Sequence, residues 1–292
     1  MAERRFSLAA LALAALSAIA SPALAEEPAA GLLGPKPVAT TPKPAMARGD
    51  LQEATLAPVR DTRPKIAIVI DDLGLDWERF QAANRLPVPV SLAFLPYGKD
   101  AQAMLDSIDQ RHAALLHLPM EPRRRRYHAG PDMVKRGTAE DIRSTLGLNL
   151  NKLRGYRGVN NHTGSLITED PVAMRHVLTE LQRRGLYFLD SKTTQRSVSA
   201  SISTRMVLPV LEGSLFLDGD FGAGGEAHVQ RQLGMLLTMA EKKGSAIGIG
   251  HPYPSTLRTL QEWTAQKQAS VRFLTADQLA DDQRAEKAKA GI

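Results

Sequence analysis

The chain has 292 residues, no cysteine and a formal net charge of +6. Without thiols the protein has no disulfides, and any transition-metal site must be built from histidine and carboxylate ligands. The basic residues do not alternate with aromatic ones, so the mild positive charge gives no reason to expect a nucleic-acid partner.

Residues 1–25 have the pattern of a signal peptide that is cleaved after export. Arg4 and Arg5 precede an apolar run over residues 8–19, and Ala23–Ala25 then has the small-x-small pattern of a cleavage site. The apolar run is too short to span a bilayer comfortably, so we expect its removal rather than its retention as an anchor. The sequence therefore predicts a protein exported to the bacterial periplasm, with no stable membrane span after cleavage.

Residues 26–63 are predicted to form a flexible linker. This segment is rich in Ala, Pro, Gly and Thr, and it cannot bury enough apolar surface to offset the entropy lost on ordering. A single domain is predicted at 64–280. Residues 281–292 form a charged, alanine-rich tail that we expect to be either a frayed helix or disordered.

From residue 64 onward, short apolar runs alternate with amphipathic stretches, which is the pattern of repeated βα units. Strands are predicted at Lys65–Ile70, Val88–Leu95, Ala113–Leu118, Tyr156–Asn160, Leu186–Asp190, Thr204–Pro209, Ser245–Gly250 and Ser270–Leu274. Helices are predicted at Trp77–Asn84, Asp100–Arg111, Ala139–Leu153, Pro171–Arg184, Glu226–Lys243 and Ser255–Lys267. Roughly seven to eight such units predict an α/β fold, a distorted (β/α) barrel; an open doubly wound sheet is the alternative that the same alternation allows.

The first predicted strand ends in two adjacent carboxylates, Asp71 and Asp72. A strand buried on both faces opens at its C-terminal end into the crevice where α/β proteins bind ligands. A cation would stabilise two like charges there, with one Asp as its ligand and the other free to accept a proton. The alternative is that the pair caps the next helix, because Asp is a good N-cap residue.

Other polar side chains also lie at or just beyond the ends of predicted strands: His117, Glu121, Asn161, His162, Asp190 and His251. Because the C-terminal ends of barrel strands converge on one face, we expect these residues to share a site with the Asp pair. One histidine at a strand end is more often a structural residue. Several such residues together favour a joint role.

The residue types at these strand ends suit a metal-dependent hydrolase. One carboxylate and two imidazoles are typical ligands of a hydrolytic zinc site that keeps a position open for water. We therefore predict Asp72, His117 and His162 as ligands of a divalent metal, zinc by preference. Asp71 is then predicted to act as the base, and His251 either to protonate a leaving group or to stabilise an oxyanion.

The remaining candidates have narrower roles. Asp190 is predicted to orient one of the histidines. Glu121 can be a metal ligand, a second base or the cap of the turn that follows it, and the sequence leaves these alternatives open. Asn161, Ser165 and Tyr253 are assigned to substrate binding, with backbone amides near Ser165 lining an oxyanion pocket and the Tyr253 ring stacking on a sugar.

Five motifs of the chain form one set: Ile70-Asp71-Asp72-Leu73-Gly74, His117-Leu118-Pro119-Met120-Glu121-Pro122, Asn161-His162-Thr163-Gly164-Ser165, Leu189-Asp190-Ser191-Lys192-Thr193 and Gly250-His251-Pro252. Together they resemble the divergent polysaccharide deacetylase family, a carbohydrate esterase-like branch related to chitooligosaccharide deacetylases. The resemblance covers about Lys65 to Leu279. It implies a distorted βα barrel and metal-dependent hydrolysis of N-acetyl or O-acetyl groups on a glycan. It also implies the first Asp of the pair as base, the second as metal ligand and the late His as acid.

Two positions depart from the better-characterised deacetylases that the family resembles. Those enzymes carry His-x-x-x-His on the third strand, where this chain has His117 followed four residues later by Glu121. They also carry Arg-x-Pro-Tyr after the fourth strand, where this chain has Asn161-His162-Thr163-Gly164. We therefore predict that His162 replaces the lost ligand from a different strand.

The leading functional hypothesis is a metal-dependent hydrolase of an acetylated glycan, such as peptidoglycan or a secreted polysaccharide. A non-catalytic glycan-binding or envelope-assembly protein that retains the fold is the alternative. A metal-dependent amidase or phosphoesterase on the same scaffold is a third possibility. The sequence leaves the oligomeric state open.

Overall fold

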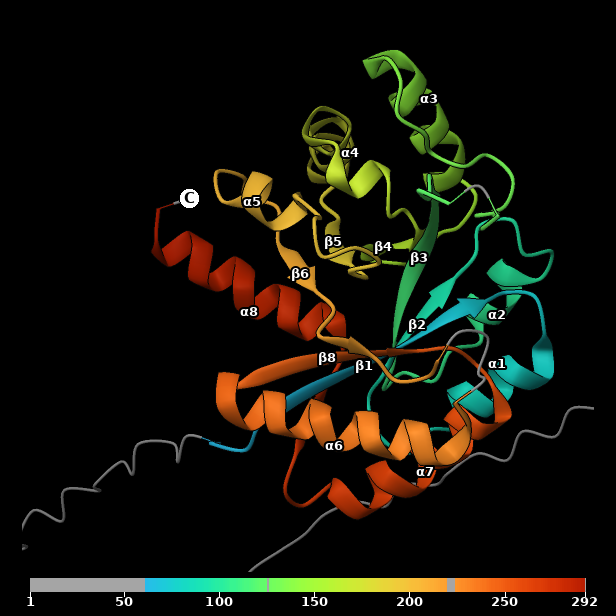
Figure 1. The fold of residues 1–292 in the computed structure, drawn as a ribbon, viewed down its shortest axis with the longest axis vertical. Helices are drawn as coiled ribbons and strands as arrows, with labels where there is room; N and C mark the ends of the chain where they lie inside the picture. Colours follow the sequence, from blue (N-terminus) through green and yellow to red (C-terminus); the bar gives the residue numbers. More distant parts are fainter. Residues whose placement is uncertain (1–60, 125, 220–223, 292) are drawn as a thin grey trace, which may run out of the picture. The chain divides into compact units, whose positions relative to one another are not determined.

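The computed structural model describes residues 61–124, 126–219 and 224–291. The predicted signal peptide and nearly all of the predicted linker lie outside the described residues. A curled, all-parallel sheet forms the centre of the domain, and helices surround it (Figure 1). This architecture is the distorted (β/α) barrel predicted from the sequence.

The sheet has the strand order β6-β5-β4-β3-β2-β1-β8-β7, and β9 also pairs with β1. The strands are β1 Lys65–Leu73, β2 Ser91–Phe94, β3 Ala113–Met120, β4 Gly158–Thr163, β5 Tyr187–Asp190, β6 Val210–Glu212, β7 Leu215–Phe216, β8 Ser245–Gly250 and β9 Arg272–Leu274. The helices are α1 Trp77–Asn84, α2 Ala101–Asp106, α3 Ala139–Leu150, α4 Pro171–Arg183, α5 Ser199–Ser203, α6 Gly225–Lys243, α7 Pro254–Lys267 and α8 Ala276–Lys289, with a short 3-10 helix η1 at Ile167–Glu169. Within the described part of the chain, β6 and β7 are the two edges of the sheet.

Strand β1 is buried on both faces, as its continuous apolar run predicts. Ile66, Ile68 and Ile70 pack in the large core between the sheet and helices such as α1, α4 and α6. Ala67 and Val69 belong to a second, smaller core that includes residues of α8. Since successive side chains of a strand point to opposite faces, a strand between two cores needs an apolar residue at every position.

Two predicted elements differ most from the structure, and the helix α8 was not among the predicted helices. Thr204–Pro209 is not a strand; it forms the turn after α5, and the strand begins at Val210. The helix predicted over Asp100–Arg111 ends at Asp106. The C-terminal helix α8 begins with a capping box at Thr275 and continues across the predicted tail boundary at residue 281.

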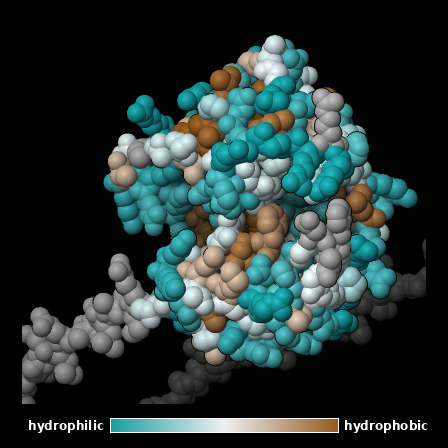
Figure 2. Space-filling view, in the orientation of Figure 1, coloured by the Kyte–Doolittle hydropathy of each residue, from teal (hydrophilic) through white to brown (hydrophobic). Residues whose placement is uncertain are grey.

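The face of the domain shown in Figure 2 is mostly hydrophilic, and its hydrophobic residues form small clusters among the polar ones. Among the residues that the structure describes, no helix is both long and apolar enough to cross a membrane.

Candidate metal centre

A bulge at the end of β1 brings two neighbouring carboxylates to the same site. The pairing of β1 with β2 shifts register between Ile70 and Leu73, and Asp72 has a φ of 58°, in the left-handed region. In a regular strand the two side chains would point to opposite faces, and the bulge breaks this alternation. His117 Nε2 consequently lies 3.7 Å from Asp71 Oδ2 and 3.3 Å from Asp72 Oδ1.

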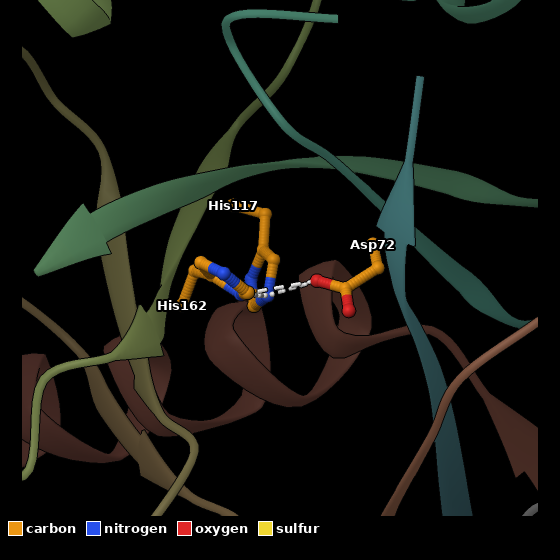
Figure 3. A group of neighbouring side chains, drawn as sticks. All are labelled: Asp72, His117 and His162. Atoms are coloured by element: carbon orange, nitrogen blue, oxygen red, sulfur yellow. Dashed lines mark hydrogen bonds and ion pairs between the residues drawn. The ribbon is translucent and has the colours of Figure 1, made fainter. Parts of the chain in front are cut away.

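Asp72, His117 and His162 each direct one ligand atom toward a common point (Figure 3). They come from β1, β3 and β4. Asp72 Oδ1 lies 3.0 Å from His162 Nδ1 and 3.3 Å from His117 Nε2, and the two nitrogens are 3.1 Å apart. A tetrahedral zinc ion with bonds of about 2.0–2.1 Å separates its ligand atoms by about 3.3 Å, so the three spacings fit one divalent cation.

Hydrogen bonds around the cluster orient its ligand atoms toward one another. Asn160 Nδ2 donates to Asp71 Oδ1 at 2.7 Å, which turns the amide oxygen of Asn160 toward His117 Nδ1 at 2.9 Å. Because that oxygen only accepts, His117 Nδ1 carries a proton, and Nε2 is the nitrogen that faces His162 Nδ1 at 3.1 Å and Asp72 Oδ1 at 3.3 Å. Asp72 Oδ1 is buried and accepts no hydrogen bond of acceptable geometry from the described residues. A buried oxygen of this kind is what a cation would satisfy.

The two carboxylates differ in their affinity for protons. Burial raises the pKa of Asp71, and the charges of His117 and His251 offset this effect only in part. Burial would also raise the pKa of Asp72, but its contacts with His117 and His162 outweigh burial and hold the pKa well below its usual range. Asp72 is therefore suited to remain an anionic ligand, and Asp71 is suited to accept a proton.

His251, which follows β8, is oriented by Asp218. His251 Nδ1 donates to Asp218 Oδ1 at 2.9 Å, while Asp218 Oδ2 accepts the backbone N–H of His251 at 2.7 Å and the hydroxyl of Thr256 at 3.0 Å. Burial alone would lower the pKa of His251, but the hydrogen bond and the charge of Asp218 raise it to about 9. His251 Nε2 lies 3.9 Å from Asp72 Oδ2, so the imidazole flanks the cluster.

Sequence reasoning missed Asp218. The signal that would have found it is the apolar run Leu215–Leu217, which ends in a carboxylate as β1 does. Strand β7 comprises only Leu215 and Phe216, too short for a periodic pattern to reveal it.

Asp190 does not orient a histidine, contrary to the prediction. Both Ser197 and Ser199 donate their hydroxyls to Asp190 Oδ2, and Asp190 Oδ1 accepts the backbone N–H of Lys192 at 2.8 Å. These bonds fasten the segment after β5, and the orienting role for His251 belongs to Asp218.

Glu121 directly follows β3, and its carboxylate contacts Arg136 and is not part of the cluster of Asp72, His117 and His162. Its Oε2 lies 3.2 Å from Arg136 Nε and accepts the backbone N–H of Arg136 at 3.1 Å. Its carbonyl accepts the backbone N–H of Leu166 at 3.1 Å. Glu121 therefore links the segments that follow β3 and β4.

The three residues assigned to substrate binding lie in different settings. The Asn161 side chain is buried, and its oxygen accepts the backbone N–H of Ser191 at 2.8 Å. Ser165 Oγ accepts a backbone N–H from the segment after β3. Tyr253 lines a hollow of about 160 Å³ together with Asp72 and His251. Of the three, Tyr253 alone shares this hollow with the cluster.

The fold and the site together define a class: a parallel (β/α) barrel with a carboxylate and two imidazoles at the C-terminal ends of its strands. The family model described as divergent polysaccharide deacetylase matches residues 68–280. The chain belongs to this family.

The matches to relatives of known sequence or structure cover most of the chain. An uncharacterized protein of Haemophilus influenzae is 35% identical over 198 residues, which are 68% of this chain and 70% of the relative. The uncharacterized protein YibQ of Escherichia coli K12 is 29% identical over 219 residues, 75% of this chain and 68% of the relative. The crystal structure of an uncharacterized protein from Agrobacterium tumefaciens C58 has a TM-score of 0.70 at 27% identity, and the match covers 74% of this chain and 89% of that one.

Proposed function

We propose that the protein is a metal-dependent hydrolase that removes acetyl groups from an amino-sugar polymer. The observation that carries this proposal is the cluster of Asp72, His117 and His162, whose ligand atoms lie within 4.8 Å of one another. Membership of a polysaccharide deacetylase family supports the glycan as substrate. Two imidazoles and one carboxylate favour zinc as the cation.

The proposed roles follow from the contacts of each side chain. A divalent cation bound by the cluster supplies Lewis acidity, which polarises a carbonyl group and makes water more acidic. Asp71 accepts a proton from the attacking water as the water oxygen bonds to the acyl carbon. His251, whose pKa of about 9 keeps it protonated at neutral pH, donates a proton to the amine or alkoxide that leaves. Asp218 holds the imidazole of His251 in position.

Export would bring this activity to its substrate. The signal peptide predicted at residues 1–25 would deliver the protein to the periplasm, where peptidoglycan and nascent secreted polysaccharides are exposed. The linker predicted at residues 26–63 would then give the domain reach. Fractionation of cells tests the export, and N-terminal sequencing of the mature protein tests the cleavage; a protein that retains Met1 and remains in the cytoplasmic fraction would contradict both.

Metal analysis of variants tests the catalytic proposal. Asp72→Asn preserves size and tolerates the left-handed backbone, so we expect a folded protein that has lost both bound zinc and acetate release. We expect Asp71→Asn to keep zinc and to lose activity by about 10²-fold or more. Glu121→Gln is the matched control and should retain both, because Glu121 pairs with Arg136. Wild-type protein that takes up no metal would overturn the proposal.

A non-catalytic glycan-binding role is the second candidate. Glu121 favours it, because this residue stands where the better-characterised deacetylases have a second imidazole. Under this alternative, wild-type protein would show no turnover, and the Asp71→Asn/His251→Ala double variant would bind glycan as tightly as wild type. Acetate release by wild type excludes it.

A further inference from the structure

The positive charge of the chain is concentrated in two segments that follow strands of the sheet. Residues 121–136 follow β3 and residues 191–198 follow β5. Together these segments have eight basic and two acidic residues, an excess of six, which equals the net charge of +6 of the whole chain. Since β3, β4 and β5 are neighbours in the parallel sheet, both segments leave it at the end where the cluster lies (Figure 1).

Hydrogen bonds connect both segments to the end of β4, which carries His162. The backbone N–H of Arg123 donates to Ser165 Oγ at 3.1 Å. The hydroxyl of Thr193 donates at 2.9 Å to the carbonyl oxygen of Thr163, the residue after His162. The two basic segments are therefore attached to the strand end that supplies a ligand of the cluster.

One carboxylate joins guanidinium groups from the two segments. Glu169 in η1 pairs with Arg123 from the first segment and with Arg196 from the second, where Arg196 Nη2 lies 3.1 Å from Glu169 Oε1. The neighbouring carboxylate of Asp170 caps α4. Two cations share one anion, and 49% of the Arg123 side chain and 68% of the Arg196 side chain are exposed. Both guanidinium groups therefore retain N–H donors for a ligand.

Arg124 and Arg126 add positive charge that no ion pair offsets among the described residues. Both side chains are exposed. The Arg126 guanidinium lies 5.1 Å from the centre of the Tyr127 ring, and its Nη2 lies 3.2 Å from the Tyr127 hydroxyl. We refer to these two arginines, together with Arg123 and Arg196, as the basic rim.

The chemistry of the basic rim suits an acidic polysaccharide. Guanidinium groups bind carboxylate and phosphate groups through paired hydrogen bonds. A membrane surface fits less well. None of the large hydrophobic side chains that are exposed in the described part of the chain belongs to residues 121–136 or 191–198, so these segments offer no apolar anchor for a bilayer. Membership of a polysaccharide deacetylase family favours a glycan over other polyanions.

We propose that the basic rim binds the anionic groups, carboxylate or phosphate, of an acidic polysaccharide. The rim holds this polymer by charge and takes no part in breaking a bond. Binding therefore requires neither the metal nor the proposed deacetylase activity.

Calorimetric titrations of the full-length protein test this inference. A hexamer of galacturonic acid should bind at least about tenfold more tightly than the neutral hexamer of N-acetylglucosamine at low ionic strength. Arg124→Gln/Arg126→Gln should weaken binding of the acidic hexamer severalfold. Lys242→Gln/Lys243→Gln is the matched control and should keep the wild-type affinity. It removes the same charge from exposed positions just before β8, at the opposite end of the sheet.

Further probes identify the anionic group and the kind of partner. A phosphorylated oligosaccharide of the same length distinguishes phosphate from carboxylate, and tighter binding of either than of the neutral hexamer supports the inference. Binding of the anionic probe should weaken as salt rises from about 20 to about 200 mM, because salt screens exposed charges. Equal affinity for charged and neutral hexamers, an equal loss in the two double variants, or a preference for phosphatidylglycerol vesicles over both oligosaccharides would overturn the inference.

Asp72→Asn separates this inference from the proposed function. This variant should lose zinc and acetate release, yet it should bind the acidic hexamer as wild type does. A variant that no longer binds the hexamer would show that the polymer is held at the cluster, and the inference would be wrong. If wild-type protein binds the acidic hexamer but releases no acetate from any glycan, the proposed function fails and the inference stands.

Discussion

Asp71 and Asp72 are adjacent in the chain but differ in environment because of one backbone conformation. Asp72 has a φ of 58°, a region that most residues avoid and that Asp and Asn tolerate best. An Asp at this position therefore tolerates the left-handed backbone and also supplies the carboxylate of the cluster. The sequence predicted two roles for the pair, but the bulge that separates the roles depends on the pairing of β1 with β2.

The charge of His251 makes folding depend on pH. The pKa of His251 is about 9 in the folded protein and 6.5 ordinarily, so protonation favours the folded state. The stabilisation is complete below about pH 6.5 and is lost as the pH rises through about 9. The shift corresponds to at most about 3 kcal/mol. We expect the free energy of unfolding of the metal-free protein, measured with urea, to fall by up to that amount between these two pH values.

Asp218→Asn tests the physical cause of this pH dependence. Removing the carboxylate removes the main interaction that raises the pKa of His251, so stability should become much less dependent on pH in this interval. His176→Gln on α4 is the control and should keep the wild-type dependence. If the stability of the Asp218→Asn protein depended on pH as that of wild type does, a group other than His251 would be the cause of the pH dependence.

At the level of elements, the turn after β1 packs against the turn after β2 through backbone contacts. A Cβ added at Gly98 would lie 2.4 Å from the carbonyl oxygen of Gly74, and Gly74 itself has a φ of 107°. Gly98→Ala must therefore displace the turn that follows Asp72. We expect a loss of about 1–3 kcal/mol in the free energy of unfolding and weaker zinc binding, measured by thermal unfolding and by metal titration.

Gly234→Ala is a matched control within α6. A Cβ added there meets nothing within 4 Å, so the change should stabilise the protein by roughly 0.5–1 kcal/mol through the helix propensity of alanine. Zinc binding should be unchanged. Destabilisation of similar size in both variants would contradict the packing explanation for Gly98.

The length of each element explains which ones the sequence could predict. Trp77–Asn84 agrees with α1, and the predicted helix Glu226–Lys243 agrees with α6 to within one residue, because helices of eight or more residues show their apolar face. Strand β6 has three residues and β7 has two, which is too few to show the alternation of apolar and polar residues that predicts a strand. Their conformation depends on neighbouring strands: Ser214, for example, donates its backbone N–H to the Ile247 carbonyl of β8 at 2.8 Å.

At the level of the whole molecule, α8 connects parts of the sheet that are distant in strand order. Asp282 of α8 lies 2.7 Å from the Lys65 ammonium at the start of β1. Gln283 donates to the Val210 carbonyl of β6 at 3.2 Å. The sequence did not reveal this role, because half of the residues of α8 are charged and its buried side comprises only small residues and Leu279. The periodic signal of this helix was therefore weak.

The ammonium of Lys287 anchors α8 to the segment between α5 and β6. Its Nζ donates to the carbonyl oxygens of Ser203 at 2.8 Å, Met206 at 2.7 Å and Leu208 at 3.0 Å, and burial lowers its pKa. Lys287→Met keeps an unbranched side chain that is one atom shorter and removes all three donors. Because the carbonyl groups would lose these partners, we expect a loss of about 1–3 kcal/mol in the free energy of unfolding, measured with urea. Lys289→Met removes an equal charge from an exposed position on the same helix and should change stability by less than about 0.5 kcal/mol. If the two variants were equally stable, the three hydrogen bonds would not be what holds α8 in place.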